Sequence, residues 1–101
     1  MSVFVLSDEA LSDLFDAWSF VANDHPIAAD KLEQDILRAC ALLARHPGIG
    51  HRRADLYDDD SVRFHPVRTW YLVVYEWNTT PLSIVRILHG SRDVIRELGD
   101  G

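Results

Sequence analysis

Trp70-Tyr71-Leu72-Val73-Val74-Tyr75-Glu76-Trp77 is the stretch of sequence that decides the fold. Aromatic and β-branched side chains dominate it, and these residue types are enriched in β-strands. Asn78-Thr79-Thr80-Pro81 follows with turn-forming residues, and Leu82–His89 is then a second run rich in Leu, Ile and Val. Two such runs joined by so short a connection predict an antiparallel hairpin.

The residues on either side of this hairpin extend the prediction. Val62-Arg63-Phe64-His65 predicts a further strand upstream, again separated from its neighbour by a short connection. Gly48–Asp60, which precedes it, contains glycines and a run of aspartates and is predicted to be a loop. Gly90 is expected to end the sheet, and Ser91–Leu98 is expected to form a short terminal helix or an ordered tail.

The N-terminal part predicts a strand followed at once by an amphipathic helix. Val3–Leu6 is a short run of strand-forming residues, and Ser7 or Asp8 can cap the helix that follows. Apolar residues then recur three or four positions apart, namely Leu11, Leu14, Phe15, Trp18, Val21 and Ala22. The solvent side is expected to carry the polar residues between them, Asp13, Asp16 and Ser19.

A second helix is predicted from Ile27 to His46. Pro26 suits the first turn of a helix, and Pro47-Gly48 closes its far end. One stripe of this helix is apolar, with Leu32, Ile36, Ala39 and Leu43. The tight link between the two helices predicts an antiparallel helical hairpin.

The predicted element order is β-α-α-β-β-β in a single α+β domain that covers residues 1–101. We expect the helical hairpin to pack on one face of a small antiparallel sheet, because an uncovered apolar sheet face would be costly. A chain of 101 residues fits one domain of this kind.

Composition and charge exclude several functions. The formal net charge is −6 with a single lysine, so the chain lacks the basic footprint of a nucleic-acid binder, and no direct DNA binding is expected. The lone Cys40 permits neither an internal disulfide nor a cysteine-built zinc site. We expect no cofactor and no metal. Neither a signal peptide nor a long apolar run is present, so the expected location is the cytoplasm, with no membrane contact.

The charge is nevertheless unevenly distributed. Residues 1–50 contain eight acidic against three basic residues, whereas residues 61–96 contain five arginines against two acids. This asymmetry is consistent with a solvated mixed surface or with a polarised binding surface.

Several segments, taken together and in order, are similar to a known family. They include Asp13-Leu14-Phe15-Asp16-Ala17-Trp18, Leu42–Arg53, Tyr71–Tyr75 and Ile84–Asp93. From about Leu6 to Leu98 the chain resembles the ParE branch of the RelE/ParE superfamily, which comprises toxins of bacterial toxin–antitoxin modules.

The resemblance implies a function and two partners. ParE-type toxins inhibit DNA gyrase by binding it, and such modules are associated with plasmid stabilization. The resemblance also implies a ParD-like antitoxin, a ribbon-helix-helix protein whose C-terminal segment wraps the toxin in a hetero-oligomer. One alternative is a RelE-like nuclease that cuts messenger RNA on the ribosome. Another is a toxin-like domain without toxicity that acts only in an antitoxin complex.

The residues themselves argue against the nuclease and favour binding over catalysis. RNA cleavage without metal needs a base, an acid and cations near the phosphate. RelE-like enzymes take these groups mainly from lysines, arginines and a C-terminal tyrosine, but residues 91–101 contain no tyrosine, and Lys31 lies on the helical hairpin. His65 and His89 are the alternative proton carriers. No catalytic residue is therefore assigned.

Arginines and aromatic residues are the candidates for contact with a target or antitoxin. They are Arg63, Arg68, Trp70, Tyr75, Trp77, Arg86, Arg92 and Arg96. Arg86 lies within a strand and needs a partner if it is buried, with Glu76 or Asp93 as candidates.

Strand alternation divides the aromatic candidates between the two sheet faces. It places Tyr71, Tyr75 and Trp77 on one face and Trp70 on the other. The second face has no predicted cover, so this face or the outer groove of the hairpin is expected to receive an apolar antitoxin segment, unless the aromatic residues are simply core.

Overall fold

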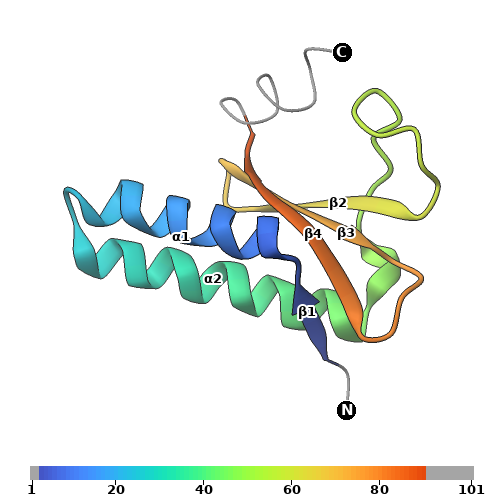
Figure 1. Ribbon diagram of the computed structural model, residues 1–101, viewed down its shortest axis with the longest axis horizontal. Helices are drawn as coiled ribbons and strands as arrows, with labels where there is room; N and C mark the ends of the chain where they lie inside the picture. The colour runs from blue at the N-terminus through green and yellow to red at the C-terminus, as the bar shows by residue number, and fades with distance from the viewer. Residues whose placement is uncertain (1–2, 91–101) are drawn as a thin grey trace.

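The computed structural model describes residues 3–90, which form a helical hairpin and a four-stranded sheet (Figure 1). The elements in chain order are β1 (Phe4–Leu6), α1 (Asp8–Ala22), α2 (Pro26–Arg45), the 3-10 turn η1 (Pro47–Ile49), β2 (Val62–Val67), β3 (Tyr71–Glu76) and β4 (Leu82–His89). The predicted β-α-α-β-β-β order and the α+β class are confirmed. The main difference in bounds is β2, which continues through Pro66 to Val67.

The sheet is mixed, with strand order β1-β4-β3-β2. The predicted antiparallel meander is correct for β2, β3 and β4. The first strand differs, because β1 pairs in parallel with β4 and places Phe4 opposite Leu82. The N-terminal strand therefore lies at one edge of the sheet, beside the last strand along the chain (Figure 1).

Ser7 joins β1, α1 and β4 at one point. Its side chain accepts a hydrogen bond from the Ala10 N–H at 2.9 Å and so caps α1 as predicted. Its hydroxyl also donates to the Val85 carbonyl at 2.7 Å, and its backbone N–H donates to the Ile84 carbonyl at 3.0 Å. The start of α1 is thereby fixed against β4.

The second helix is capped by a residue that the sequence prediction missed. The His25 Nδ1 atom accepts a hydrogen bond from the Ala28 N–H at 3.1 Å, and Pro26 occupies the first turn. The buried stripe of α2 recurs every three or four residues and comprises Ala29, Leu32, Ile36, Cys40 and Leu43. Burial raises the pKa of the Cys40 thiol to about 12, so this side chain acts as a small apolar core residue.

The main core lies between the helical hairpin and one face of the sheet. The strands contribute Val73 and Tyr75 of β3 with Ile84 and Ile87 of β4, all of them buried. These residues pack against the buried stripes of α1 and α2.

The opposite face of the sheet carries a second, smaller core, so the expectation that this face is open is wrong. Val62, Phe64, Val74 and Leu88 are buried there. Leu56 and Tyr57, from the loop before β2, pack against them, and the Tyr57 and Phe64 rings meet edge to face at 6.0 Å. The loop of residues 50–61 therefore covers this face of the sheet. The adjacent apolar residues Leu56 and Tyr57 within the loop are the sequence signal that could have predicted its packing on the sheet.

Helix α1 is rotated relative to its prediction. Ala10, Leu14 and Ala17 face the core, whereas Leu11 and Phe15 are 56% and 66% exposed. Asp13, expected in solvent, is largely buried. Small alanines on the inner side let the helix lie close to β4, which leaves the larger side chains outside. Among residues 3–90, no helix combines the length and apolarity needed to cross a bilayer.

Candidate functional site

Arg86 is a structural residue that fastens β4 to α1. Its Nε and Nη2 atoms donate to the two carboxylate oxygens of Asp13 at 2.7 and 3.0 Å, and Glu9 lies 3.9 Å away. Asp13 takes the place predicted for Glu76, while Asp93 lies outside the described residues. The pairing of β3 with β4 contains a bulge next to Arg86. Val74 pairs with Arg86, but the next residue, Tyr75, pairs with Ile84, so Val85 has no partner on β3.

The Asp13 carboxylate also accepts a backbone hydrogen bond from β4 where β1 no longer pairs with it. Beyond Ile84, β4 has no further pairing with β1, and the Ile87 N–H donates instead to Asp13 Oδ2 at 3.0 Å. A bidentate ion pair and a backbone hydrogen bond thus converge on one side chain, which joins β4 to α1.

Tyr75, another candidate contact residue, lies in the core. Its hydroxyl donates to the Pro47 carbonyl at 2.6 Å and accepts from the Gly50 N–H at 2.9 Å, so it fixes the end of α2 to the sheet. Gly50 has to be glycine because a Cβ there would overlap the Tyr75 ring. Burial raises the pKa of Tyr75, which keeps its phenol protonated and able to donate.

Arg63, which is half-buried, and the exposed Trp77 form a pair where β3 ends. The Arg63 guanidinium lies 5.4 Å from the centre of the Trp77 ring, a cation–π arrangement. Both side chains donate to the Asp60 carbonyl, Trp77 through Nε1 at 3.0 Å. Trp77 follows the last residue of β3 and remains 41% exposed.

Arg68 and Trp70 lie in the β2–β3 turn, at the other end of β3. Arg68 has a φ of 54°, uncommon for a residue with a side chain, and its Nη2 lies 2.8 Å from Asp35 Oδ2 on α2. Trp70 is 60% exposed and its ring stacks on His89, with centres 6.5 Å apart. Beside them is a cavity of about 390 Å³ that is also lined by Phe20 and Val21.

The candidate residues are therefore not brought into one site. The two arginine–tryptophan pairs are separated by the length of β3, roughly 17–20 Å for six residues. Arg86 and Tyr75 are engaged inside the fold, and Arg92 and Arg96 lie outside the described residues.

The two candidate proton carriers are also apart. His65 lies on β2 and His89 at the end of β4, so their strands lie about 10 Å apart, with β3 between them. The two residues are also offset along the sheet, because His65 pairs with Val73 and His89 with Tyr71. Burial, and secondarily His51, lower the pKa of His65. His89 contacts Tyr71 edge to face at 5.4 Å in addition to its stack with Trp70. The described residues contain no group of three His, Cys, Asp or Glu placed to hold a metal.

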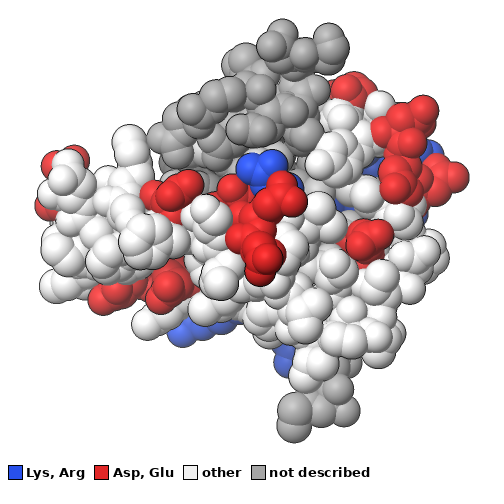
Figure 2. All heavy atoms as spheres, in the orientation of Figure 1, with Lys and Arg blue, Asp and Glu red and all other residues white. Residues whose placement is uncertain are grey.

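The arginines of the sheet and its preceding loop are largely neutralised by nearby acids. Ion pairs join Arg52 to Asp60, Arg53 to Asp55 and Arg68 to Asp35. The hydrogen bond from Arg53 lowers the pKa of Asp55, and hydrogen bonds from Ser61 lower that of Asp59. Figure 2 shows acidic side chains over both the helical hairpin and the loop before β2, with few basic ones exposed on this face.

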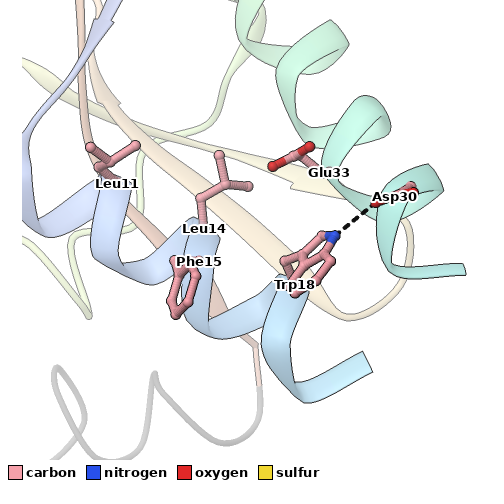
Figure 3. A pocket seen from close by; sticks show the side chains of 6 residues that line it. All are labelled: Leu11, Leu14, Phe15, Trp18, Asp30 and Glu33. Carbon is pink, nitrogen blue, oxygen red and sulfur yellow. Dashed lines mark hydrogen bonds between the residues drawn. The ribbon is translucent and has the colours of Figure 1, made fainter. Parts of the chain in front are cut away.

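The outer side of the helical hairpin carries a groove that sequence reasoning placed only in general terms. Its volume is about 490 Å³ (Figure 3). Helix α1 supplies Leu11, Leu14, Phe15 and Trp18, and α2 supplies Asp30 and Glu33. The Trp18 Nε1 atom donates to Asp30 Oδ1 at 2.9 Å, which holds the ring across the groove. The sequence signal that was missed is the presence of alanines among the apolar residues of α1. Ala10 and Ala17 permit close packing against the sheet, which leaves Leu11, Phe15 and Trp18 to line the groove.

Comparisons with known proteins agree with the observed fold. Residues 4–94 match the family model described as the ParE toxin of the type II toxin–antitoxin system parDE. A solved structure described as the chromosomal ParDE TA system from P. aeruginosa superposes with a TM-score of 0.71 at 21% sequence identity. The match covers 88% of this chain and 96% of that chain. No curated protein matches the chain by sequence.

Proposed function

The chain belongs to the ParE toxin family of type II toxin–antitoxin systems, and we propose that it inhibits DNA gyrase by binding it and is neutralised by a ParD-like antitoxin. On this proposal it acts in the cytoplasm, where gyrase works, and can contribute to plasmid stabilization. The antitoxin is a ribbon-helix-helix protein that holds the toxin in a hetero-oligomer.

The observation that carries the proposal is the apolar groove on the outer side of the hairpin. Leu11 and Phe15 are exposed next to each other along this groove, and adjoining apolar side chains in a groove are typical of a contact site for a partner. A groove between two helices suits an apolar segment laid along it. The antitoxin is the partner that a toxin of this family has to meet before its target.

The Arg68–Trp70 turn is the surface we assign to gyrase. A tryptophan that is 60% exposed next to a cavity and an arginine has the composition of an interface hot spot. The strained backbone of Arg68 is consistent with a conformation kept for contact with a partner. The Trp77 ring, in contrast, is already covered on one side by Arg63.

A supercoiling assay tests this function directly. Purified chain should block supercoiling by purified gyrase, and co-expression with the product of the adjacent gene should restore it. We expect Trp70→Ala to weaken inhibition about tenfold or more. Trp77→Ala serves as the matched control, with a smaller effect, and melting curves verify that both variants fold.

Two other results would replace the proposal. Unchanged supercoiling together with metal-free cutting of messenger RNA on ribosomes, abolished in His65→Ala or His89→Ala, would identify a RelE-like nuclease. Unchanged supercoiling without any effect on translation, at good expression, would identify a binding domain that acts only in its antitoxin complex.

A further inference from the structure

The groove between α1 and α2 has one apolar wall and one acidic wall. Leu11, Phe15 and Trp18 follow one another at intervals of four and three residues along α1. Asp30 and Glu33, three residues apart, lie together on the facing side of α2 (Figure 3). The two walls therefore run parallel and differ in chemistry.

The spacing of the apolar wall fits a helix as its occupant. Leu11 to Trp18 spans about 10 Å, or two helical turns, at 1.5 Å per residue. A partner helix presents its own apolar side chains at the same intervals of three and four residues, so its ridges can enter the spaces between those of α1. The side chains on one face of an extended strand recur at about 6.8 Å and do not match this repeat.

The acidic wall adds a charge requirement. The Glu33 side chain makes no hydrogen bond or ion pair with any residue that the structure describes. Asp30 lines the groove and uses Oδ1 to hold Trp18, and its other oxygen has no hydrogen-bond partner among the described residues. Residues 1–50 carry eight acids against three basic residues, which leaves this side of the molecule negative. A helix with acidic flanks would be repelled, and one with Lys or Arg along this edge would be attracted.

We propose that the groove selects its partner by charge: it takes an amphipathic helix whose apolar stripe covers Leu11, Phe15 and Trp18 and whose Lys or Arg residues face Glu33 and Asp30. This proposal rests on the function proposed above and specifies the antitoxin segment that the groove accepts. Glu33 is then a specificity-determining residue, and Trp18 is positioned for the contact by Asp30.

Two matched peptides test the proposal on the full chain. Each has about 18 residues, long enough to form a helix, with an identical leucine stripe and either Lys or Glu on one flank. We expect the Lys peptide to bind about tenfold tighter than the Glu peptide, measured by fluorescence anisotropy, with a difference that shrinks at high salt. Glu33→Lys should remove or reverse this preference. Asp58→Lys makes the same charge change on the exposed loop and should preserve it.

A third variant locates the binding. Phe15→Asp places a charge in the apolar wall at an exposed position and should abolish binding of both peptides without lowering the melting temperature. Equal binding of the two peptides, unaffected by Glu33→Lys, would overturn the charge selection while leaving the groove as a docking site. Binding of neither peptide, when the adjacent gene product still restores supercoiling, would overturn the groove proposal while leaving the proposed function intact.

Discussion

The two faces of α1 are built from different side chains and have different tasks. The face toward the sheet carries small or medium residues, Ala10, Leu14 and Ala17. The side that lines the groove adds Leu11 and two larger aromatic residues, Phe15 and Trp18. The inner face also holds the carboxylate of Asp13, which binds Arg86. Apolar character alone therefore does not say which side of this helix is core.

The difference has a physical reason. Close approach of α1 to β4 needs small side chains, and the alanines allow Asp13 to reach both Arg86 and the Ile87 N–H. Burial of the Asp13 carboxylate is tolerated because its contacts with Arg86 and with the Ile87 N–H are charge-assisted hydrogen bonds. The larger side chains are then left for the groove, where a second protein can cover them. Three experiments test this division of the helix, and a fourth tests a residue outside it.

The largest effect is expected from Asp13→Ala, which breaks the inner face. Arg86 would lose its bidentate partner and the Ile87 N–H its acceptor, at a cost of about 3 kcal/mol in the free energy of unfolding. Urea unfolding measures this change. Asp16→Ala removes an exposed carboxylate from the same helix and should change stability by less than about 0.5 kcal/mol. Equal losses of stability in the two variants would mean that the hydrogen bonds of Asp13 to Arg86 and Ile87 do not stabilise the fold.

A second pair of substitutions compares two adjacent positions of α1 that differ in burial. Leu14→Ala should cost about 2–3 kcal/mol because Leu14 is buried against the sheet. Phe15→Ala should cost less than about 0.5 kcal/mol because Phe15 is 66% exposed, yet it should weaken binding of the antitoxin. Thermal melting and a binding assay on both variants measure the two quantities. A large loss of stability in Phe15→Ala would place that residue in the core instead.

Trp18→Phe sharpens the description of the outer face. It keeps an aromatic ring but removes the 2.9 Å hydrogen bond to Asp30, which is exposed, so we expect a loss of about 0.5–1 kcal/mol in stability. Asp30→Ala should have an effect of similar size, and the double variant should show that the two losses are not additive. Fully additive losses would indicate that the hydrogen bond does not form in solution.

The smallest effect concerns pH and leaves α1 unchanged, since this helix contains no histidine. The pKa of His65 is lowered from 6.5 in the folded chain, so below pH 6.5 the unfolded chain binds the proton more readily than the folded one. The free energy of unfolding should therefore be highest, as far as His65 is concerned, above pH 6.5, and it should decrease as the pH falls from 6.5 toward 5.5. Urea unfolding of the wild-type chain and His65→Gln across this range should show a shallower decrease in the variant. Identical slopes would contradict the assignment.

Local signals made most of the fold predictable. Ser7 as a cap, Pro47-Gly48 as a stop and the β-branched run of Trp70–Trp77 indicate element types from neighbouring residues alone. The parallel pairing of β1 with β4 could not be derived in this way, because it depends on how the helical hairpin returns the chain. The Asp13–Arg86 pair was missed for the same reason, since 73 positions separate its partners.

The candidate site was predictable by residue type but not by arrangement. Trp70 and Trp77 were named as candidate contact residues and are both exposed, yet they lie at opposite ends of β3. Tyr75 has the same composition signal and is core, because its hydroxyl finds partners at Pro47 and Gly50. Phe15 was assigned to the helix stripe and lies outside, because Ala10 and Ala17 pack better against the sheet.

Because β1 pairs with β4, the sheet can form only after nearly the whole chain has been synthesised. The carbonyl that accepts the hydrogen bond from the Ser7 hydroxyl lies 78 positions later in the chain. Until β4 has been synthesised, β1 therefore has no strand to pair with, and Asp13 cannot bind Arg86. Closure of so long a loop slows folding relative to a protein held by local contacts. The hairpin can form early during translation, but the sheet that supports both arginine–tryptophan pairs is completed only by its last strand.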